Sequence, residues 1–342
     1  MSTPLHIGLI GAGRIGKVHA EAIANHIPQA RLVGVADVVL AAAEEIAARL
    51  NVPRAVADYR ELLEDPDVDA VVIASATDTH ARLIEEAAAA GKDIFCEKPI
   101  DFDLERIDRA LAAAADAGVK LQIGFNRRFD ANFGKVREMI ATGKIGQPHV
   151  LRITSRDPAP PPIEYVKVSG GLFLDMTIHD FDMARFLIGC DVSEIYATAG
   201  VMVDPAIGEA GDVDTALITL TFENGVLGAI DNSRRAVYGY DQRVEVFGSE
   251  GMVAVANEQP DRHVYANVEG VQSALPLYFF LERYLDSYIA EMQAFVEAVM
   301  ENREPPVTGE DGRVPVVMGL AAQKSLREKR PVALEEIRNA SS

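Results

Sequence analysis

Short apolar runs alternate with Ala-rich amphipathic stretches through the first third of the chain. The apolar runs are rich in Val, Ile and Leu and are typical of strands, whereas the stretches between them have the periodicity of helices. Repeated strand-then-helix units predict a parallel sheet wound through right-handed crossovers. The predicted strands are 5–13, 30–38, 68–75, 92–99 and 119–126, and the predicted helices are 17–27, 41–50, 81–91 and 104–118.

This pattern changes after about residue 125, where one or two helices precede a series of strands. Residues 215–234 hold the pair Asn224-Gly225 between two alternating segments, which predicts a hairpin, and residues 242–258 suggest a second one. Strands without intervening helices favour a mostly antiparallel sheet with helices on one face. We therefore expect an α/β chain: an N-terminal Rossmann doubly wound parallel sheet over residues 1–124, and a C-terminal α+β domain with a large, mostly antiparallel open sheet over residues 125–342.

Composition narrows the function classes. The chain has 342 residues, enough for two domains with separate cores. Its 33 Lys+Arg against 52 Asp+Glu give a net charge of -19, which argues against nucleic acid or a membrane surface as partner. The apolar runs are too short to span a bilayer, and the N-terminus does not resemble a signal peptide. We expect a cytoplasmic protein that acts on small molecules.

The two cysteines, Cys96 and Cys190, lie far apart and outside any CxxC pattern. They predict neither a disulfide framework nor a structural zinc site. Cys96 could be a nucleophile, but its place in an apolar run favours a buried strand residue.

Gly11, Gly13 and Gly16 form a G-x-G-x-x-G motif between the first predicted strand and helix. Such glycines let the backbone approach a pyrophosphate at a helix N-terminus, although alone they could simply make a tight turn. Asp37 follows Gly16 by 21 residues, the spacing at which a carboxylate accepts from the ribose hydroxyls of NAD. Together they predict NAD as cofactor. The candidate cofactor-binding residues are Gly11, Gly13, Arg14, Ile15, Gly16, Asp37, Ser75, Thr77, His80, Glu97 and Lys98.

Two of these assignments have alternatives. The small polar residues from Ser75 to His80 suit contact with ribose and pyrophosphate, but a helix start capped by Asp78 or Thr79 would look similar. Lys98 ends a predicted strand at the sheet edge that binds ligands, where a lysine can hold a developing alkoxide. Its position is equally compatible with an exposed lysine in a loop.

Asp175 and His179 stand four residues apart in the largely apolar segment 170–182. On one continuous helix they share a stripe with Asp182. Alone, such a pair is more often a solvated helix face; with a nucleotide fold and Lys98 it predicts a catalytic site. Alcohol oxidation releases a hydride and a proton, and histidine is well matched to accept the proton. His179 is the candidate base.

Two Asp and one His could instead bind a metal ion. We expect no metal, because hydride transfer assisted by Lys and His needs no Lewis acid. The catalytic candidates are Lys98, Asp175 and His179. The Pro-rich segment 157–165 is equally well interpreted as a connector or as a functional loop. The substrate-binding candidates are Asn126, Arg128, Asp157, Asp175, His179 and Tyr240.

The glycine motif, Asp37, Glu97-Lys98-Pro99 and the segment 169–189 together resemble the Gfo/Idh/MocA family of oxidoreductases, over essentially the whole chain. Within the family, segments 156–171 and 175–186 are most similar to the bacterial inositol 2-dehydrogenases. The resemblance implies that Lys98 binds the reacting oxygen and lowers its pKa, and that Asp175 holds substrate or relays the proton. The resemblance also implies that the reaction needs no metal ion. It further implies a homotetramer whose subunits pack through their open sheets.

The expected function is NAD-dependent oxidation of a secondary hydroxyl of a cyclic polyol, first of all myo-inositol to 2-keto-myo-inositol (scyllo-inosose), in inositol catabolism. Another inositol isomer or a pyranose sugar is an alternative that motifs cannot separate. A non-catalytic NAD- and sugar-sensing regulator of the same fold is another alternative, against which Lys98, Asp175 and His179 argue. A reductase of imines or tetrapyrroles is disfavoured by the dense polar set and the absence of Trp.

Overall fold

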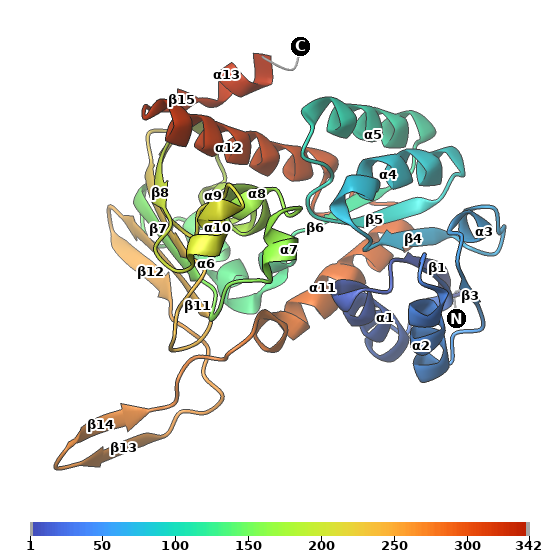
Figure 1. The fold of residues 1–342 in the computed structure, drawn as a ribbon, viewed down its shortest axis with the longest axis horizontal. Coiled ribbons are helices and arrows are strands. Elements are labelled where there is room, and N and C mark those ends of the chain that lie inside the picture. Colours follow the sequence, from blue (N-terminus) through green and yellow to red (C-terminus); the bar gives the residue numbers. More distant parts are fainter. Residues whose placement is uncertain (1–2, 340–342) are drawn as a thin grey trace. The chain divides into compact units, whose positions relative to one another are not determined.

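The computed structural model describes residues 3–339, which divide by their contacts into two compact units (Figure 1). The first unit runs to Phe129 and includes Leu285–Val316, and the second comprises Asp130–Tyr284 and the chain from Val317 onward. The segment Leu285–Val316 thus belongs to the first unit although it follows most of the second unit in sequence. The single division expected at residues 124 and 125 did not include this return of the chain, which arises because Met292, Phe295 and Val296 pack into the first unit's core.

The first unit is built on a six-stranded parallel sheet in the order β3-β2-β1-β4-β5-β6. This order confirms the predicted Rossmann sheet, whose two halves meet between β1 and β4. Its strands are β1 (Leu5–Ile10), β2 (Ala30–Ala36), β3 (Ala55–Val56), β4 (Ala70–Ile73), β5 (Asp93–Glu97) and β6 (Leu121–Gly124). Its helices are α1 (Arg14–His26), α2 (Leu40–Leu50), α3 (Arg60–Leu63), η1 (Thr77–Thr79), α4 (His80–Ala89), α5 (Leu104–Ala117) and η2 (Asn126–Phe129).

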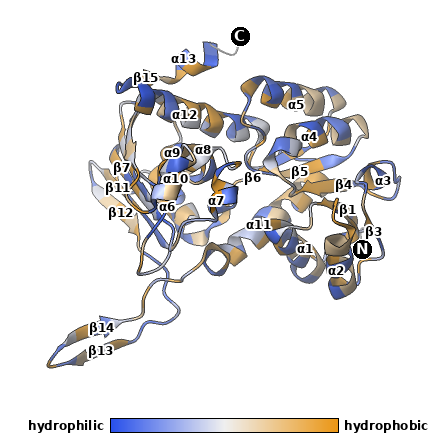
Figure 2. Ribbon diagram, in the orientation of Figure 1, coloured by the Kyte–Doolittle hydropathy of each residue, from blue (hydrophilic) through white to orange (hydrophobic). Residues whose placement is uncertain are grey.

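The parallel strands are apolar because helices cover both faces of the sheet. Every residue of β4 is buried, and the hydropathy colours of Figure 2 mark β1 and β4 as hydrophobic. Helix α5 shows how sequence fixes helix ends: the Asp103 side chain accepts from the Arg106 N–H at its start, and Gly118 ends it at a φ of 68°.

The second unit holds a seven-stranded sheet in the order β12-β11-β7-β10-β9-β8-β15. Only the pair of β10 with β7 is parallel, so the sheet is mostly antiparallel, as predicted. Its strands are β7 (Pro148–Arg156), β8 (Val192–Gly200), β9 (Thr215–Phe222), β10 (Leu227–Ser233), β11 (Asp241–Gly248), β12 (Gly251–Val255) and β15 (Val332–Ala333). Both predicted hairpins form, β9 with β10 and β11 with β12.

Helices lie against one face of this sheet, and α9 packs on β7 and β10 (Figure 1). The helices of the unit are α6 (Ala131–Ala141), α7 (Ile163–Val166), α8 (Gly171–Asp175), α9 (Thr177–Ile188), α10 (Pro205–Glu209) and α13 (Leu334–Arg338). Helices α11 (Phe280–Met300) and α12 (Gly309–Glu328) each contain a boundary between the units.

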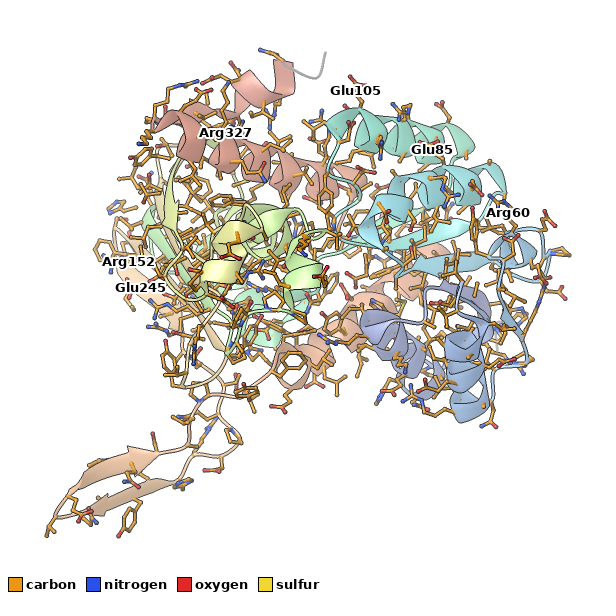
Figure 3. The ribbon with its side chains drawn as sticks, viewed as in Figure 1. Arg60, Glu85, Glu105, Arg152, Glu245 and Arg327 are labelled. Atoms are coloured by element: carbon orange, nitrogen blue, oxygen red, sulfur yellow. The ribbon has the colours of Figure 1, made fainter. Side chains whose placement is uncertain are left out.

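The opposite face of the sheet is open. Leu217, Leu227 and Phe247 are each at least half exposed there. Arg152 on β7 and Glu245 on β11 form an exposed ion pair of 3.4 Å (Figure 3), which adds little stability because water screens it.

An additional hairpin of β13 (Val264–Asn267) and β14 (Gly270–Ser273) stands away from the sheet (Figure 1). All of its strand residues are exposed, and the sequence pattern did not predict it. Within residues 3–339, no helix is both long enough and apolar enough to cross a membrane.

Candidate functional site

Two of the three motif glycines are required by close packing. Gly11 has a φ of +105°, and a Cβ there would lie 2.5 Å from the Ala74 carbonyl oxygen. A Cβ on Gly16 would lie 2.0 Å from the Gly11 carbonyl oxygen. Gly13 is different, because a Cβ there would meet nothing within 4 Å. The turn is therefore tight against β4, and it leaves open space at Gly13, where α1 begins and a pyrophosphate would approach.

Asp37 lies beside this turn. One carboxylate oxygen accepts from the Ala12 N–H at 2.7 Å, and the other accepts from the Val39 N–H at 2.8 Å. The side chain is half-exposed, whereas the neighbouring Val38 is 90% exposed. A carboxylate at the end of β2 is thus held next to the motif glycines, as the predicted ribose contact requires.

The predicted cofactor-binding residues after β4 differ in their exposure to solvent. Ser75 and Thr77 are half-exposed, and the Ser75 hydroxyl lies 2.7 Å from the Thr79 hydroxyl. His80 is buried, with Nδ1 at 2.8 Å from the Pro99 carbonyl oxygen and Nε2 at 3.1 Å from the Ser75 carbonyl oxygen. The His80 ring therefore joins the segments that follow β4 and β5, and its predicted contact with the cofactor stays a prediction.

Glu97 also faces inward. One of its oxygens lies 2.8 Å from His19 Nε2, and the other accepts from the Lys98 N–H at 3.3 Å. Lys98 is half-exposed at the end of β5, and the peptide bond between Lys98 and Pro99 is cis. Lys98 thus sits at the carboxyl edge of the sheet, the edge that carries Gly11 and Asp37.

The remaining candidates of the first unit differ in their surroundings. Arg14, the first residue of α1, is exposed, and Ile15 is half-buried. Asn126 is only 2% exposed in η2. Arg128 Nη2 lies 2.9 Å from an Asp311 carboxylate oxygen. Substrate contacts by Asn126 and Arg128 stay predictions.

The segment that carries Asp175 and His179 forms two helices rather than one. Helix α8 ends at Asp175, α9 begins at Thr177, and Met176 separates them. The Thr177 hydroxyl bonds the Leu172 carbonyl oxygen at 3.3 Å and the Asn232 side-chain oxygen at 2.6 Å. The expectation of one continuous helix was therefore wrong.

Of the three residues predicted to share a stripe, Asp175 ends α8, whereas His179 and Asp182 lie three residues apart on α9. Asp182 is 1% exposed, and Asp175 and His179 are half-exposed. Gly189 ends α9 at a φ of 70°.

Arg234, which follows β10, organises the candidate site of the second unit. Its guanidinium lies 2.9 Å from an Asp175 oxygen and 3.6 Å from an Asp157 oxygen, and its side chain is only 3% exposed. Burial disfavours its charge, but the two carboxylates outweigh burial and raise the pKa of Arg234. Asp157 and Asp175, which were predicted as separate candidates, thus lie against the same arginine. We call Arg234, Asp157, Asp175 and Tyr165 the Arg234 cluster.

Tyr165 donates to the second Asp175 oxygen at 2.8 Å. Burial of its hydroxyl and the Asp175 carboxylate raise the pKa of Tyr165, so it remains a donor at neutral pH. Sequence analysis missed Tyr165 and Arg234. The available signals were the aromatic residue closing the Pro-rich segment 157–165 and the arginine pair at 234 and 235, which follow a predicted strand.

A buried polar pair holds α9 on the sheet. Asp180 is fully buried, and its carboxylate accepts from the Asn232 amide at 2.8 Å. Asn232 occupies an inward-facing position of β10, where the alternating pattern elsewhere places apolar residues. The helix that carries His179 is therefore fixed in rotation by specific hydrogen bonds as well as by packing.

Tyr240 differs from the other candidates of the second unit. It is 7% exposed, and its ring packs edge-on against Tyr284 with centroids 6.0 Å apart. Most of this side chain belongs to the core, so its predicted substrate contact has no support from its packing.

Comparisons with known proteins cover both units. Residues 5–125 match an oxidoreductase family with an NAD-binding Rossmann fold, and residues 133–254 match the GFO/IDH/MocA C-terminal domain. The myo-inositol 2-dehydrogenase of Thermotoga maritima is 52% identical over 97% of this chain and 99% of its own length. The inositol 2-dehydrogenase of Rhizobium meliloti is 48% identical over 96% of this chain and 99% of its own.

Among solved structures, the scyllo-inositol dehydrogenase of Lactobacillus casei with bound NAD(H) and scyllo-inositol superposes with a TM-score of 0.91. It is 32% identical, and the match covers 97% of this chain and 100% of that one. The similarity is therefore not confined to the glycine motif.

Proposed function

Because the chain belongs to the Gfo/Idh/MocA family of NAD-dependent oxidoreductases, we propose that its substrate is myo-inositol, oxidised at one secondary hydroxyl to 2-keto-myo-inositol (scyllo-inosose). The protein is an NAD-dependent dehydrogenase acting on CH–OH groups. The proposal of myo-inositol rests on the names of the relatives at 52% and 48% identity.

The proposed chemistry divides the work among three side chains. NAD takes the hydride from carbon. Lys98 binds the reacting oxygen as an ammonium and stabilises developing negative charge there, His179 accepts the hydroxyl proton, and Asp175 holds a substrate hydroxyl or relays the proton.

The observation that carries this proposal is the Arg234 cluster. Two aspartates oriented by one buried arginine present fixed acceptors, and a polyol needs such acceptors because each hydroxyl is a donor. Tyr165 adds a further constraint on Asp175. A preorganised carboxylate costs little rearrangement on binding, which suits a ring with several hydroxyls.

NAD is proposed as strongly preferred over NADP. Asp37 repels a 2′-phosphate, and the exposed residues that follow it, Val38 and Val39, provide no cation to bind one. The expected preference is at least about tenfold in kcat/KM, which corresponds to about 1.4 kcal/mol.

A second candidate substrate is scyllo-inositol, which the Lactobacillus casei relative binds. The two isomers differ only in the orientation of one hydroxyl. The Arg234 cluster offers hydrogen-bond acceptors and donors to either isomer, so a comparison of oxidation rates must separate the two substrates.

Assembly and location are also proposals. The apolar side chains on the open sheet face, including Leu217, Leu227 and Phe247, support packing of sheets against each other in a homotetramer. We propose the cytoplasm, where NAD is available, as its location.

The test is NADH formation with a panel of myo-, scyllo- and chiro-inositol and glucose. We expect the highest kcat/KM with myo-inositol and NAD. A higher value with scyllo-inositol would select the second candidate, and no NADH with any cyclic polyol would refute the proposed function.

A further inference from the structure

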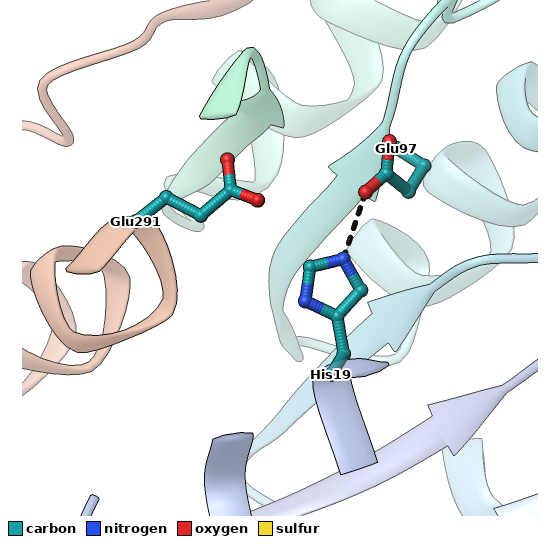
Figure 4. Close-up of side chains that lie close together, drawn as sticks. All are labelled: His19, Glu97 and Glu291. Atoms are coloured by element: carbon teal, nitrogen blue, oxygen red, sulfur yellow. Dashed lines mark hydrogen bonds and ion pairs between the residues drawn. The ribbon is translucent and has the colours of Figure 1, made fainter. Parts of the chain in front are cut away.

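Three ionisable side chains meet inside the first unit. His19 comes from α1, Glu97 from β5 and Glu291 from α11, and Figure 4 shows the Glu291 carboxyl group pointing toward the other two. His19 and Glu291 are fully buried, and Glu97 is 8% exposed. One ligand atom from each lies within 4.8 Å of the others. Among the described residues, no other group of three such side chains is this close.

This group carries polar atoms without partners. Neither carboxyl oxygen of Glu291 has a hydrogen-bond partner among the described residues, and His19 Nδ1 also lacks one. A buried polar group without a partner costs about 1–3 kcal/mol. Stability alone therefore does not explain a glutamic acid at position 291, and unexplained polar groups of this kind concentrate at functional sites.

The chemistry of the group favours a proton on Glu291. Burial, and then the neighbouring Glu97 carboxylate, raise the pKa of Glu291 well above its usual range. A neutral carboxylic acid has one O–H to donate. His19 Nε2 already faces Glu97 at 2.8 Å, so an acid that donates to the His19 ring would complete a Glu-His-Glu chain of hydrogen bonds.

This series of hydrogen bonds reaches the segment that carries Lys98. Glu97 Oε2 accepts from the Lys98 N–H at 3.3 Å, and its carboxyl group packs against Gly124, where a Cβ would lie 3.1 Å away. On the other side of Lys98, the Pro99 carbonyl oxygen is held by His80 at 2.8 Å. The residues before and after Lys98 are therefore both fixed by buried histidines.

We propose that His19 and Glu291 are positioning residues for alcohol oxidation: together they fix the Glu97 carboxylate, and through it the direction in which Lys98 leaves β5. This inference rests on the proposed role of Lys98 at the reacting oxygen. Neither residue touches substrate or cofactor in this account.

The test compares two substitutions of Glu291. Glu291→Met keeps the length of the side chain and removes its polar atoms, whereas Glu291→Gln keeps a neutral group that can donate. We expect Glu291→Met to lower kcat about tenfold with the KM for the polyol within about twofold, and to keep or raise Tm, because an unpartnered polar group is removed. Glu291→Gln should recover kcat to within about threefold of wild type.

A double-mutant cycle separates positioning from a structural role. In the Lys98→Ala background, Glu291→Met should cause no further loss of kcat, because the group it positions is absent. The matched control is Glu297→Met on the exposed side of α11, which should keep wild-type kcat. His19→Gln, which can keep a donor for Glu97, and His19→Leu repeat the comparison if Glu291→Met fails to fold.

Several results would overturn the inference. A wild-type kcat in Glu291→Met or His19→Leu would do so, and so would equal multiplicative losses with and without Lys98. Stoichiometric metal in the purified wild type that is lost in Glu291→Gln would assign the group to a cation instead. The ratio of variant to wild-type rates tests the positioning, while the wild-type rates on the polyol panel test the proposed function.

Discussion

The two clusters of ionisable side chains in this protein accommodate their charges in different ways. In the second unit, Arg234 lies between Asp157 and Asp175, so opposite charges compensate one another. In the first unit, Glu97 and Glu291 lie close together beside His19, and burial raises the pKa of Glu291 well above its usual range, which favours its protonated form. The Arg234 cluster is therefore stabilised by pairing of opposite charges, whereas the group around Glu291 avoids a second buried negative charge when Glu291 is protonated.

This difference has consequences for how each cluster responds to change. A paired cluster fails when one partner is removed, because the others keep their charge in a poorly solvated place. A protonated cluster tolerates a neutral replacement but responds to pH. The Arg234 cluster should thus be sensitive to substitution, and the group around Glu291 should be sensitive to proton concentration.

The largest effect is expected for Arg234→Met. Removal of the guanidinium leaves Asp157 and Asp175 without their cation, and breaking a buried ion pair costs about 3–5 kcal/mol. Because both aspartates are partly exposed, we expect about 3 kcal/mol, measured as the free energy of unfolding in urea. The matched control is Arg235→Met at the exposed next position. A loss below about 1 kcal/mol would show that charge pairing does not hold this cluster together.

A smaller, pH-dependent effect is expected for Glu291→Gln. Burial raises the pKa of Glu291 in the folded protein, whereas the unfolded chain releases this proton above about pH 4.3. Wild-type stability from this group therefore falls as pH rises from that value toward the folded-state pKa. Glu291→Gln removes this dependence, so its stability relative to wild type should increase between pH 5 and pH 8.

Urea unfolding of both proteins at the two pH values measures this change. Glu297→Gln, an exposed substitution on the same helix, serves as the control and should show a constant difference from wild type. A relative stability of Glu291→Gln that is unchanged or lower at pH 8 would mean that Glu291 is ionised in the folded protein.

The smallest effect is expected for Tyr165→Phe, which removes one donor to Asp175. Because Tyr165 is 48% exposed, the stability loss should be about 0.5 kcal/mol. If the hydroxyl orients Asp175 for substrate, kcat/KM should fall about threefold or more. Wild-type kcat/KM in this variant would remove Tyr165 from the proposed site.

The sequence predicted the parts of the fold that local patterns determine. The apolar runs around Ile7 and Val72, the motif at Gly11 and the turn at Asn224-Gly225 each act within a few residues, and each was confirmed. The return of α11 to the first unit was missed, because its apolar face does not reveal which core it enters.

The candidate site was less predictable because its contacts join distant parts of the chain. Thr177, which begins α9 after the interruption at Met176, bonds Asn232, which is 55 residues away. Arg234 gathers Asp157 and Asp175 from separate elements, and His19 meets Glu97 across 78 residues. Periodicity placed Asp175 and His179 near each other, but it could not identify the residues that orient them.

The most direct test of this account is the pH dependence of kcat/KM for myo-inositol oxidation in wild type and His179→Ala. If His179 is the general base, the wild-type value should fall toward acid pH as its imidazole takes up a proton. The variant should lose about 10²- to 10⁴-fold activity and this acid limb while its Kd for NAD stays nearly unchanged. A His179→Ala enzyme with wild-type kcat/KM and the same acid limb would show that another group accepts the proton.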